Sequence, residues 1–291
     1  MNYDFRDKVI AVTGGAGGIG SAMCRKFAAG GARCVVVDID TRRAEEVAGG
    51  LPGNGHLGVG CDLMDWAQVG RLFERIATAH GRLDVLINNV GVTSTERFDV
   101  RDVPSIEREI GLNFVSPLVT TRLAIPLLRA SKDPRVISTV SLAGLFPQGE
   151  TPVYCASKFG LRGAMLSIGL DLREKGILAG SVLPSATDTP MLRREAVEGG
   201  NSMQFLEPPQ QPSDVVAAVV GMLDKPRLEV YARPSESFGA RLAMVVPNLL
   251  PKILPLFRKR GDRGMARYLE DLRRRGLARR VDGRWVLVDE R

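Results

Sequence analysis

A cluster of glycines between a strand-like and a helix-like segment most constrains the fold of this chain. Residues 8–12 form a short apolar run with β-branched side chains, typical of a buried strand. Residues 13–20, TGGAGGIG, contain five glycines and lead into a helical pattern over residues 21–29. Glycines at such a turn let the backbone approach a diphosphate, and the helix N-terminus stabilises its negative charge. A flexible glycine loop is the alternative, but the flanking strand and helix favour a dinucleotide-binding turn.

An aspartate follows the second apolar run at a spacing that bears on the choice of dinucleotide. Asp38 directly follows the apolar residues 34–37 and lies 18 residues after Gly20. A carboxylate at this distance can accept hydrogen bonds from both hydroxyls of an adenosine ribose and repels a 2′-phosphate. We therefore expect NAD as the cofactor. Arg42 and Arg43 follow closely and could bind a phosphate, so NADP is the alternative.

Strand-like and helix-like segments alternate along most of the chain. Strands are expected at 8–12, 33–38, 56–60, 83–88, 134–140, 177–183 and 227–231. Helices are expected near 18–30, 41–48, 65–79, 102–130, 152–175 and 213–223. The alternation predicts an α/β fold, a Rossmann-like doubly wound parallel sheet with helices on both faces. Ligands of such sheets lie beyond the carboxyl ends of the strands, where Asp38, Asp62, Asn88, Ser141 and Pro184 all fall.

A tyrosine and a lysine four residues apart lie in one of the predicted helices. The side chains of Tyr154 and Lys158 therefore share one helix face. A free tyrosine has a pKa of about 10, and a nearby cation favours the phenolate and lowers that pKa. Such a tyrosine can take a proton from an alcohol or return one to a carbonyl. The same spacing also occurs on solvated helix faces, so the pair alone does not establish a catalytic site.

Several short motifs, in order, resemble those of the short-chain dehydrogenase/reductase family in its branch of ordinary length. The resemblance covers roughly residues 5–232. It rests on the glycine turn, Asp62 in Cys61-Asp62-Leu63, Asn88-Asn89-Val90-Gly91, the tetrad Asn113, Ser141, Tyr154 and Lys158, and the segment Pro184 to Thr189. Two positions differ from the family pattern, because Val90 stands where alanine is usual and Ser185 replaces a glycine.

The resemblance implies a set of site residues. Tyr154 is expected to be the general acid/base, and Lys158 to lower its pKa and bind the nicotinamide ribose. Ser141 is expected to bind the substrate oxygen, and the Asn113 backbone carbonyl to support a water relay to Lys158. The expected cofactor-binding residues are Thr13, Gly14, Gly18, Ile19, Gly20, Asp38, Asp62, Leu63, Asn89, Gly91, Tyr154, Lys158, Pro184, Thr187 and Thr189. The expected substrate contacts are Ser141, Tyr154 and Met191.

The resemblance also implies a reaction, the interconversion of a secondary alcohol and a ketone with NAD. Two alternatives are an NADP-dependent ketoreductase and a cofactor-binding protein without catalytic turnover. The complete set of Asn113, Ser141, Tyr154 and Lys158 argues against the second alternative.

The segment after Thr189 is expected to form a substrate lid over about residues 188–212. Charges, glycines and prolines interrupt its apolar residues, which suits a mobile lid. The apolar residues are Met191, Leu192, Met203, Phe205 and Leu206. Together with Val92, Leu145, Phe146 and Val153 near the tetrad, they favour a lipophilic substrate over a sugar. A purely structural role in the core is the alternative.

Composition and the remaining motifs narrow the class of protein. The four cysteines are scattered, without a Cys-x-x-Cys pair or a Cys/His cluster, so neither a disulfide framework nor a metal site is expected. The sequence around Ser141 lacks the first glycine of a hydrolase G-x-S-x-G turn, and no G-K-[ST] follows the glycine turn. The N-terminus lacks a signal-peptide pattern, and no apolar run reaches the length of about 18 residues that a membrane span requires. We therefore expect a cytoplasmic protein.

The tail differs from the rest of the chain in charge. Residues 241–291 contain 14 Lys/Arg and 6 Asp/Glu, a net charge of +8, whereas the other 26 Lys/Arg and 27 Asp/Glu sum to −1. We therefore expect a dehydrogenase domain over residues 1–240 and a C-terminal extension over residues 241–291. The apolar section 244–257 carries Pro247, Pro251 and Pro255, a spacing that argues against a regular long helix. Met265, Leu269 and Leu272 then fall on one face of a basic amphipathic helix.

Such a tail can bind anionic lipid or pack on protein with its arginines in water. We expect packing, because soluble proteins avoid exposed apolar patches. The side chains expected to be buried, against the lid or another subunit, are Leu249, Leu250, Leu254 and Phe257, with the basic residues from Arg258 onward solvated. Peripheral membrane contact is the alternative. Nucleic-acid binding is not expected, because no aromatic residues interleave the charge. The family resemblance also implies a homodimer or homotetramer built on the helices at 152–175 and 213–223.

Overall fold

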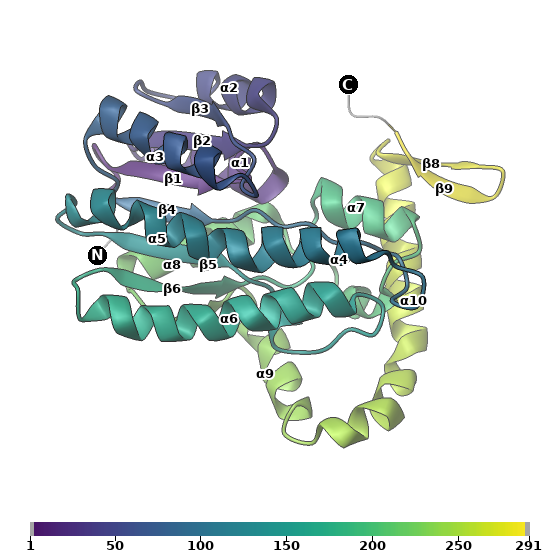
Figure 1. Ribbon diagram of the computed structural model, residues 1–291. Coiled ribbons are helices and arrows are strands. Elements are labelled where there is room, and N and C mark those ends of the chain that lie inside the picture. The colour runs from purple at the N-terminus through teal and green to yellow at the C-terminus, as the bar shows by residue number, and fades with distance from the viewer. Residues whose placement is uncertain (1–2, 289–291) are drawn as a thin grey trace.

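Seven parallel strands form the central sheet of the protein (Figure 1). The computed structural model describes residues 3–288. The strands lie in the order β3-β2-β1-β4-β5-β6-β7, and every neighbouring pair is parallel. Their bounds are β1 Val9–Thr13, β2 Arg33–Asp38, β3 Leu57–Gly60, β4 Val85–Asn88, β5 Arg135–Thr139, β6 Leu178–Leu183 and β7 Glu229–Tyr231. The predicted Rossmann-like sheet is confirmed, with each strand close to its expected bounds.

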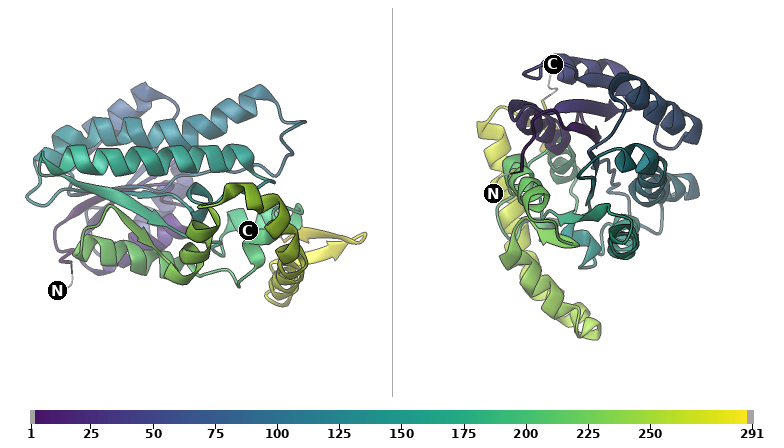
Figure 2. Two further views of the ribbon diagram at one scale, coloured as in Figure 1. Left: turned by 90° about the horizontal axis from the view of Figure 1, so that it is seen from below. Right: turned by 90° about the vertical axis from the view of Figure 1, so that its left-hand side faces the viewer.

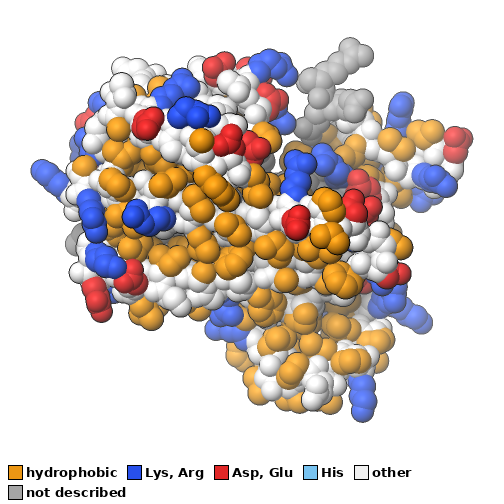
Figure 3. Space-filling view, in the orientation of Figure 1, with side chains coloured by type: hydrophobic (Ala, Val, Ile, Leu, Met, Phe, Trp, Pro, Cys, Tyr) orange, Lys and Arg blue, Asp and Glu red, His pale blue; other side chains and the backbone are white. Residues whose placement is uncertain are grey.

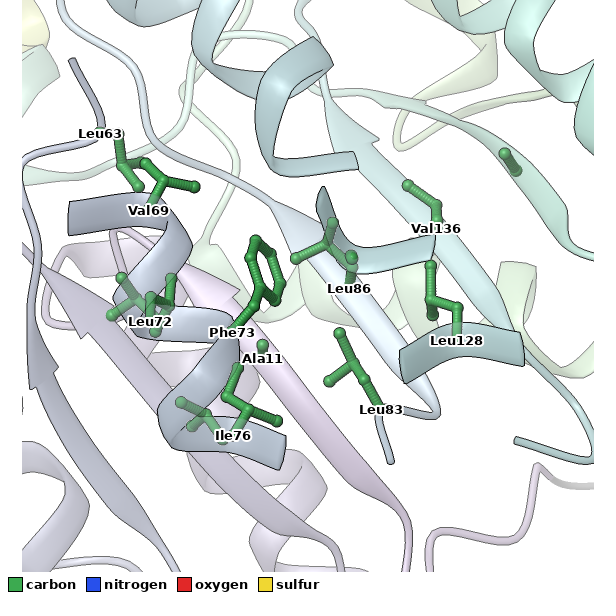
Figure 4. Close-up of a cluster of buried hydrophobic side chains, with 14 of the residues drawn as sticks. Ala11, Leu63, Val69, Leu72, Phe73, Ile76, Leu83, Leu86, Leu128 and Val136 are labelled. Carbon is green, nitrogen blue, oxygen red and sulfur yellow. The ribbon is translucent and has the colours of Figure 1, made fainter. Parts of the chain in front are cut away.

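Helices cover both faces of the sheet, because successive strand residues point to opposite sides. Val9 and Ala11 of β1 face one apolar cluster, part of which Figure 4 shows. The helices of this cluster are α3 (Trp66–His80), α5 (Ser116–Arg129) and α6 (Pro152–Arg173). Ile10 and Val12 face the other cluster, with α1 (Gly18–Ala29), α2 (Thr41–Gly49) and α8 (Pro212–Asp224). The two clusters fix the carboxyl ends of the strands, where the candidate site lies.

The single helix expected over 102–130 is interrupted in the structure. It consists of α4 (Val103–Ile110), a π-helical turn η1 (Gly111–Val115) and α5. Asn113 lies within the π-helical turn, a type of bulge that often marks a functional position. By length and apolarity, residues 103–129 are the one unbent helical segment between residues 3 and 288 that could cross a membrane. This segment packs against α3 and α6 of the fold.

The lid contains two short helices, α7 (Pro190–Val197) and η3 (Ser202–Phe205). Its two ends are joined by backbone hydrogen bonds. The Asp188 N–H donates to the Gln210 carbonyl at 2.8 Å, and the Gln210 N–H donates to the Ala186 carbonyl at 2.8 Å. The lid is therefore a closed loop with a fixed base, inserted between β6 and α8.

The tail forms an arch that leaves the body and then returns to the lid (Figures 1 and 2). Helix α9 (Pro234–Ala243) leads through a 3₁₀ turn, η4 (Pro247–Leu249), into the 25-residue helix α10 (Leu250–Arg274). Residues 244–257 do not form one regular helix, as expected, because η4 and a bend of 91° interrupt them, but from Leu250 onward they belong to the long helix α10. Pro247 and Pro251 lie in the first turn of η4 and α10, where an N–H has no helical partner to lose, and only Pro255 lies inside α10.

Two further features of the tail were not expected. The boundary proposed after residue 240 falls within α9, so the extension begins at the start of that helix, after β7. An antiparallel hairpin, β8 (Ala278–Val281) and β9 (Arg284–Leu287), follows α10. Its turn holds Asp282 and Gly283 at φ of 48° and 78°, which suits a two-residue hairpin turn.

The second half of α10 docks on the lid of the same chain. Tyr268, Leu269 and Leu272 are buried in a cluster with lid residues of α7 and η3. Close approach depends on two glycines. A β-carbon built at Gly264 would lie 1.9 Å from the Phe205 carbonyl oxygen, and one at Gly261 would lie 2.6 Å from that of Ser202.

The docking corrects part of the expected packing. The predicted face of Met265, Leu269 and Leu272 does contact protein, and every Lys and Arg between residues 258 and 288 is exposed, as expected. Of the other side chains expected to be buried, only Leu250 is buried. Leu254 is half-buried, and Leu249 and Phe257 are exposed, because the docking contacts begin at Gly261, one turn beyond them.

Candidate active site

The carboxyl ends of the central strands border one cavity of about 1840 Å³. The residues that follow β1, β2, β4, β5 and β6 all line it. The cavity continues beneath the lid to the inner side of the arch. It exceeds the roughly 300–1,000 Å³ of a typical ligand pocket. The cavity is therefore large enough for more than one small ligand.

The glycine turn leaves room for a ligand backbone at the start of α1. Gly14 has a φ of +61° and packs closely on β4, because a β-carbon there would lie 3.2 Å from the Val90 Cα. A β-carbon at Gly20 would lie 2.1 Å from the Gly14 carbonyl oxygen, so only glycine fits. Gly17, which precedes α1, has no side chain to occupy the helix N-terminus. The turn thus fits the diphosphate of a dinucleotide.

Thr13 and Asn89 shape this turn from behind. The Thr13 Oγ1 accepts hydrogen bonds from the backbone N–H of Asn89 at 2.9 Å and of Val90 at 3.2 Å. The Asn89 Nδ2 donates to the Thr13 carbonyl at 3.2 Å. Asn89 lines the cavity, whereas Thr13 and Gly20 do not. Thr13 and Gly20, which were predicted to bind the cofactor, therefore support the turn from behind. Gly14, Gly18 and Ile19 form the surface of the turn that faces the cavity.

Asp38 lies at the end of β2, beside the glycine turn. Its Oδ2 accepts a hydrogen bond from the Ala16 N–H at 3.1 Å, and its side chain lines the cavity. Arg43 also lines the cavity, with its Nη2 3.4 Å from the Ala16 carbonyl oxygen. Arg42 instead pairs with Glu46 on the exposed side of α2 at 3.0 Å. Of the two arginines considered for a phosphate, only Arg43 faces the cavity.

Asp62 and Leu63 follow β3, but neither lines the cavity. The Asp62 Oδ1 accepts a hydrogen bond from the Met64 N–H at 2.9 Å, and Leu63 is buried in the core. Their predicted contact with the cofactor therefore stays a prediction.

Tyr154 and Lys158 lie one turn apart near the start of α6, and both line the cavity. The Lys158 Nζ lies 5.6 Å from the centre of the Tyr154 ring and donates a hydrogen bond to the Thr139 carbonyl at 3.3 Å. A β-carbon at Gly91 would lie 3.3 Å from this Nζ. Glycine at position 91 therefore leaves space beside the ammonium group.

Asn113 is buried and lies behind this pair rather than on the cavity surface. Its side-chain amide forms a reciprocal pair with the Val92 backbone, with both hydrogen bonds at 2.8 Å. Its Nδ2 also donates to the Ser157 Oγ at 3.1 Å. The side chain thus ties the π-helical turn to the strand end after β4 and to α6. Its expected role in a water relay stays a prediction.

Ser141 completes the group at the end of β5. Its Oγ accepts a hydrogen bond from the Ala143 N–H at 3.1 Å, and its hydroxyl also forms a hydrogen bond with Tyr154. The segment from Pro184 to Thr189 borders the same space after β6. Thr187 accepts a hydrogen bond from the Gln210 Nε2 at 3.0 Å, and Thr189 caps α7. A β-carbon at Gly18 would lie 3.1 Å from the Thr189 Cγ2, so the glycine turn and the lid are in contact.

Comparison with known proteins identifies the family. Residues 8–198 match the family described as short chain dehydrogenase. The chain belongs to this family. It is 30% identical to the 15-hydroxyprostaglandin dehydrogenase [NAD(+)] of Homo sapiens over 229 residues, which cover 75% of this chain and 82% of that protein. It is 28% identical to a D-threitol dehydrogenase of Mycolicibacterium smegmatis, over 76% of this chain and 88% of that protein.

A solved structure shows the same fold. The crystal structure of a short chain dehydrogenase/reductase from Burkholderia phymatum in complex with NAD has a TM-score of 0.74 and 21% identity, and covers 85% of this chain and 96% of its own. This short-chain dehydrogenase is therefore an oxidoreductase that acts on alcohols or ketones.

Burial dominates the electrostatics of Tyr154 and Lys158 in this short-chain dehydrogenase. Burial raises the pKa of Tyr154 well above its usual value, the charge of Glu195 adds to the rise, and a hydrogen bond with Ser141 opposes it. Burial lowers the pKa of Lys158 to about 8, and Glu109 offsets part of that change. The expectation of a lowered Tyr154 pKa is wrong for the protein groups by themselves. Desolvation of the phenolate is the largest cause of the rise and outweighs the lowering by the hydrogen bond with Ser141.

Two buried carboxyl groups near the tetrad were not expected. The Glu195 carboxylate on α7 accepts a hydrogen bond from the Gln204 Nε2 at 2.8 Å, and burial raises its pKa. Glu109 on α4 pairs with Arg101 at 2.6 Å, yet burial still raises its pKa. The sequence did carry a signal for Glu195, because Leu192 and Ala196 place it on the buried face of a short helix.

The apolar residues expected around the substrate divide into two groups. Met191, Leu192, Met203, Leu206, Val92 and Phe146 line the cavity. Leu145, Val153 and Phe205 are buried away from it, which is the structural alternative considered for them. The arch also contributes lining residues, among them Leu250, Ile253 and Leu254. Among residues 3–288, no group of three or more His, Cys, Asp and Glu side chains is arranged to hold a metal ion.

Proposed function

We propose that this protein is an NAD-dependent dehydrogenase that interconverts a lipophilic secondary alcohol and the corresponding ketone. The observation that carries the proposal is that Tyr154, Lys158 and Ser141 line the same cavity as the glycine turn. The far wall of that cavity comes from the lid and the arch, and it contains apolar residues such as Met191, Leu206 and Ile253 beside charged ones. When bound, the nicotinamide would accept a hydride from the alcohol or supply one to the ketone.

Tyr154 exchanges a proton with the substrate oxygen in this proposal. Its raised pKa keeps the phenol protonated at neutral pH, which prepares it to donate to a ketone oxygen. The Ser141 hydroxyl, which forms a hydrogen bond with Tyr154 in the protein alone, can bind the same oxygen as negative charge develops on it. Lys158, oriented by the Thr139 carbonyl, provides the positive charge that stabilises the phenolate after transfer.

Asp38 supports NAD in preference to NADP. Its carboxylate is held by the glycine turn at the place where an adenosine ribose would bind, and a 2′-phosphate there would meet negative charge. The human relative is also named for NAD(+). Arg43 faces the same region and keeps NADP as the alternative. The residues proposed to hold the cofactor surface are Gly14, Gly18, Ile19, Asp38, Asn89, Gly91, Tyr154, Lys158, Pro184, Thr187 and Thr189.

Steady-state turnover tests the proposal directly. We expect activity with NAD and a series of secondary alcohols, with kcat/KM rising as the alkyl chain lengthens, because each added methylene buries more apolar surface. Threitol and other polyols serve as the polar comparison. A preference for polyols would contradict the lipophilic substrate. No turnover with any alcohol or ketone, despite measurable NAD binding, would instead identify a non-catalytic member of the family.

We also propose a homodimer or homotetramer. The outer face of α6 carries Phe159 and Leu170, which are exposed in the single chain and could meet a second α6. Light scattering at several concentrations measures the mass, and a purely monomeric protein would rule out this assembly.

A further inference from the structure

The arch carries apolar side chains on its outer surface. We define the arch as residues 234–260, which comprise α9, η4 and the first eleven residues of α10. Its most exposed apolar side chains include Phe238 (66% exposed) and Leu256 (77%), which do not line the cavity, and Leu242 (63%) and Val245 (74%), which border it. Figure 3 shows hydrophobic side chains gathered on this projection, below the body of the molecule. A continuous patch of this kind is rare on a soluble monomer and marks a site of contact.

The charge of the arch identifies the chemistry of that contact. Of residues 234–260, five are basic and only one, Glu236, is acidic. The five are Arg241, Lys252, Arg258, Lys259 and Arg260, and all are exposed. Exposed positive charges beside exposed apolar side chains suit the surface of an anionic bilayer.

The shape of the arch favours contact with one leaflet over a membrane span. Helix α9 and the η4–α10 segment are together apolar enough for a span, but they are bent by 91° at their junction. A ten-residue helix such as α9 is roughly 15 Å long, whereas the hydrocarbon core of a bilayer is about 30 Å thick. A short bent element can lie in the interface, with apolar side chains among the acyl chains and basic ones among the head groups.

A second copy of this chain fits the same surface less well. A twofold interface brings the same patch of two chains together. Here it would place five basic residues against five more, and the nearby acidic residues Glu236 and Glu207 already pair with Arg233 and Arg260 of the same chain. An anionic lipid surface supplies the missing negative charge.

We propose that the arch docks this protein on anionic membranes. The inner side of the arch lines the cavity through Leu249, Leu254 and Phe257, so docking would bring the substrate side of the cavity to the lipid surface. This consequence for substrate entry rests on the proposed function, whereas the docking does not.

Co-sedimentation of the full chain with vesicles tests the docking without an enzyme assay. We expect binding to vesicles of phosphatidylglycerol and phosphatidylcholine, and binding at least about tenfold weaker to phosphatidylcholine alone. Phe238→Glu/Leu256→Glu should weaken binding to the anionic vesicles at least about tenfold, because it places two charges on the apolar surface. Lys252→Glu/Lys259→Glu should weaken it by a similar factor and reduce its salt dependence.

Val100→Glu is the matched control, because Val100 is 72% exposed but lies outside the arch. This variant should bind anionic vesicles as the wild type does. Wild-type protein that stays in the supernatant, or a Phe238→Glu/Leu256→Glu variant that binds undiminished, overturns the proposal. A drop in oligomeric mass caused by the same variant without vesicles would assign the arch to a second copy, and also overturns it.

The test separates docking from catalysis. None of the four substituted arch side chains lines the cavity, so turnover of a water-soluble alcohol should stay at the wild-type level. Failure of the proposed function would appear as lost turnover in the wild type, independent of vesicle binding.

Discussion

The nucleotide-binding fold and the C-terminal extension use their apolar residues in opposite ways. In residues 3–232, two large clusters bury the apolar side chains on either face of the sheet, and the polar site lies at the strand ends. In the extension, one smaller cluster joins α10 and the hairpin to the lid, and the arch keeps its apolar side chains exposed. The first region therefore has a core of its own, whereas the second is held only where it meets the lid.

Asp188 shows how the two regions are joined. Burial by itself would raise the pKa of this carboxyl, but hydrogen bonds from Tyr268, Arg193 and Arg275 lower it overall. The Tyr268 hydroxyl and the Arg275 Nη1 each lie 2.7 Å from it. Because Asp188 stands between Thr187 and Thr189 in the segment after β6, the tail is anchored beside residues proposed to bind the cofactor. We expect changes within residues 3–232 to affect catalysis. Changes in the packing of α10 on the lid should affect mainly the substrate side, because that packing is against α7 and η3.

The largest expected effect is on catalysis alone. Tyr154→Phe removes the transferable proton and keeps the ring, so turnover should fall by roughly 10²–10⁴. NAD binding, measured by fluorescence or calorimetry, should change little. Tyr3→Phe is the control, because the Tyr3 hydroxyl is buried without a hydrogen-bond partner among residues 3–288 and lies far from the cavity lining. Retention of more than about a tenth of the activity in Tyr154→Phe would mean that another group transfers the proton.

The next effect concerns cofactor choice and should leave the extension unchanged. Asp38→Ser removes the charge that faces a 2′-phosphate, so the ratio of kcat/KM for NADP to that for NAD should rise about tenfold or more. Adding Arg43→Gln should reverse part of this gain. Arg42→Gln should not, because Arg42 pairs with Glu46 outside the cavity. Equal effects of the two arginine changes would show that neither side chain reaches the phosphate.

A smaller effect should separate the two regions structurally. Gly264→Ala places a methyl group against the Phe205 carbonyl. The free energy that holds α10 on the lid should therefore become less favourable by about 1–3 kcal/mol. Limited proteolysis should then cleave the extension faster, and KM for an apolar substrate should rise while NAD affinity holds. Gly221→Ala in α8 is the control, because a β-carbon there meets no atom within 4 Å. Equal protease resistance of the two variants would contradict the close helix–lid contact.

The smallest expected effect is a pH dependence within the fold. The pKa of Lys158 is lowered to about 8, below its value of about 10.4 in an unfolded chain, so the unfolded state binds more protons above pH 8. Relative to Lys158→Met, the wild type should therefore gain stability as the pH rises from about 8 to 9.5. The raised pKa of Tyr154 acts in the opposite direction only near and above pH 10. Thermal midpoints of both proteins across this range provide the measurement, and a constant difference would contradict a lowered Lys158 pKa.

Local sequence patterns determined most of the nucleotide-binding fold. The strands and helices of residues 3–232 could be predicted because period-two and helical patterns depend on near neighbours. The glycine turn, Tyr154 and Lys158 could be predicted for the same reason, since each rests on spacings within one segment. The Asp282-Gly283 turn was also readable from local sequence, but the hairpin was not predicted.

Only the tertiary structure decided how distant segments meet. Tyr268 and Asp188 are 80 residues apart in the chain, and no local pattern pairs them. The same holds for the choice of Arg43 over Arg42 at the cavity, and for the burial that raises the pKa of Tyr154. It holds as well for the arch, where the prolines predicted a broken helix but the docking at Gly261 and Gly264 left one half of α10 buried and the other exposed. Pairing, solvent exclusion and packing depend on the surroundings of a side chain, and those exist only once the chain has folded.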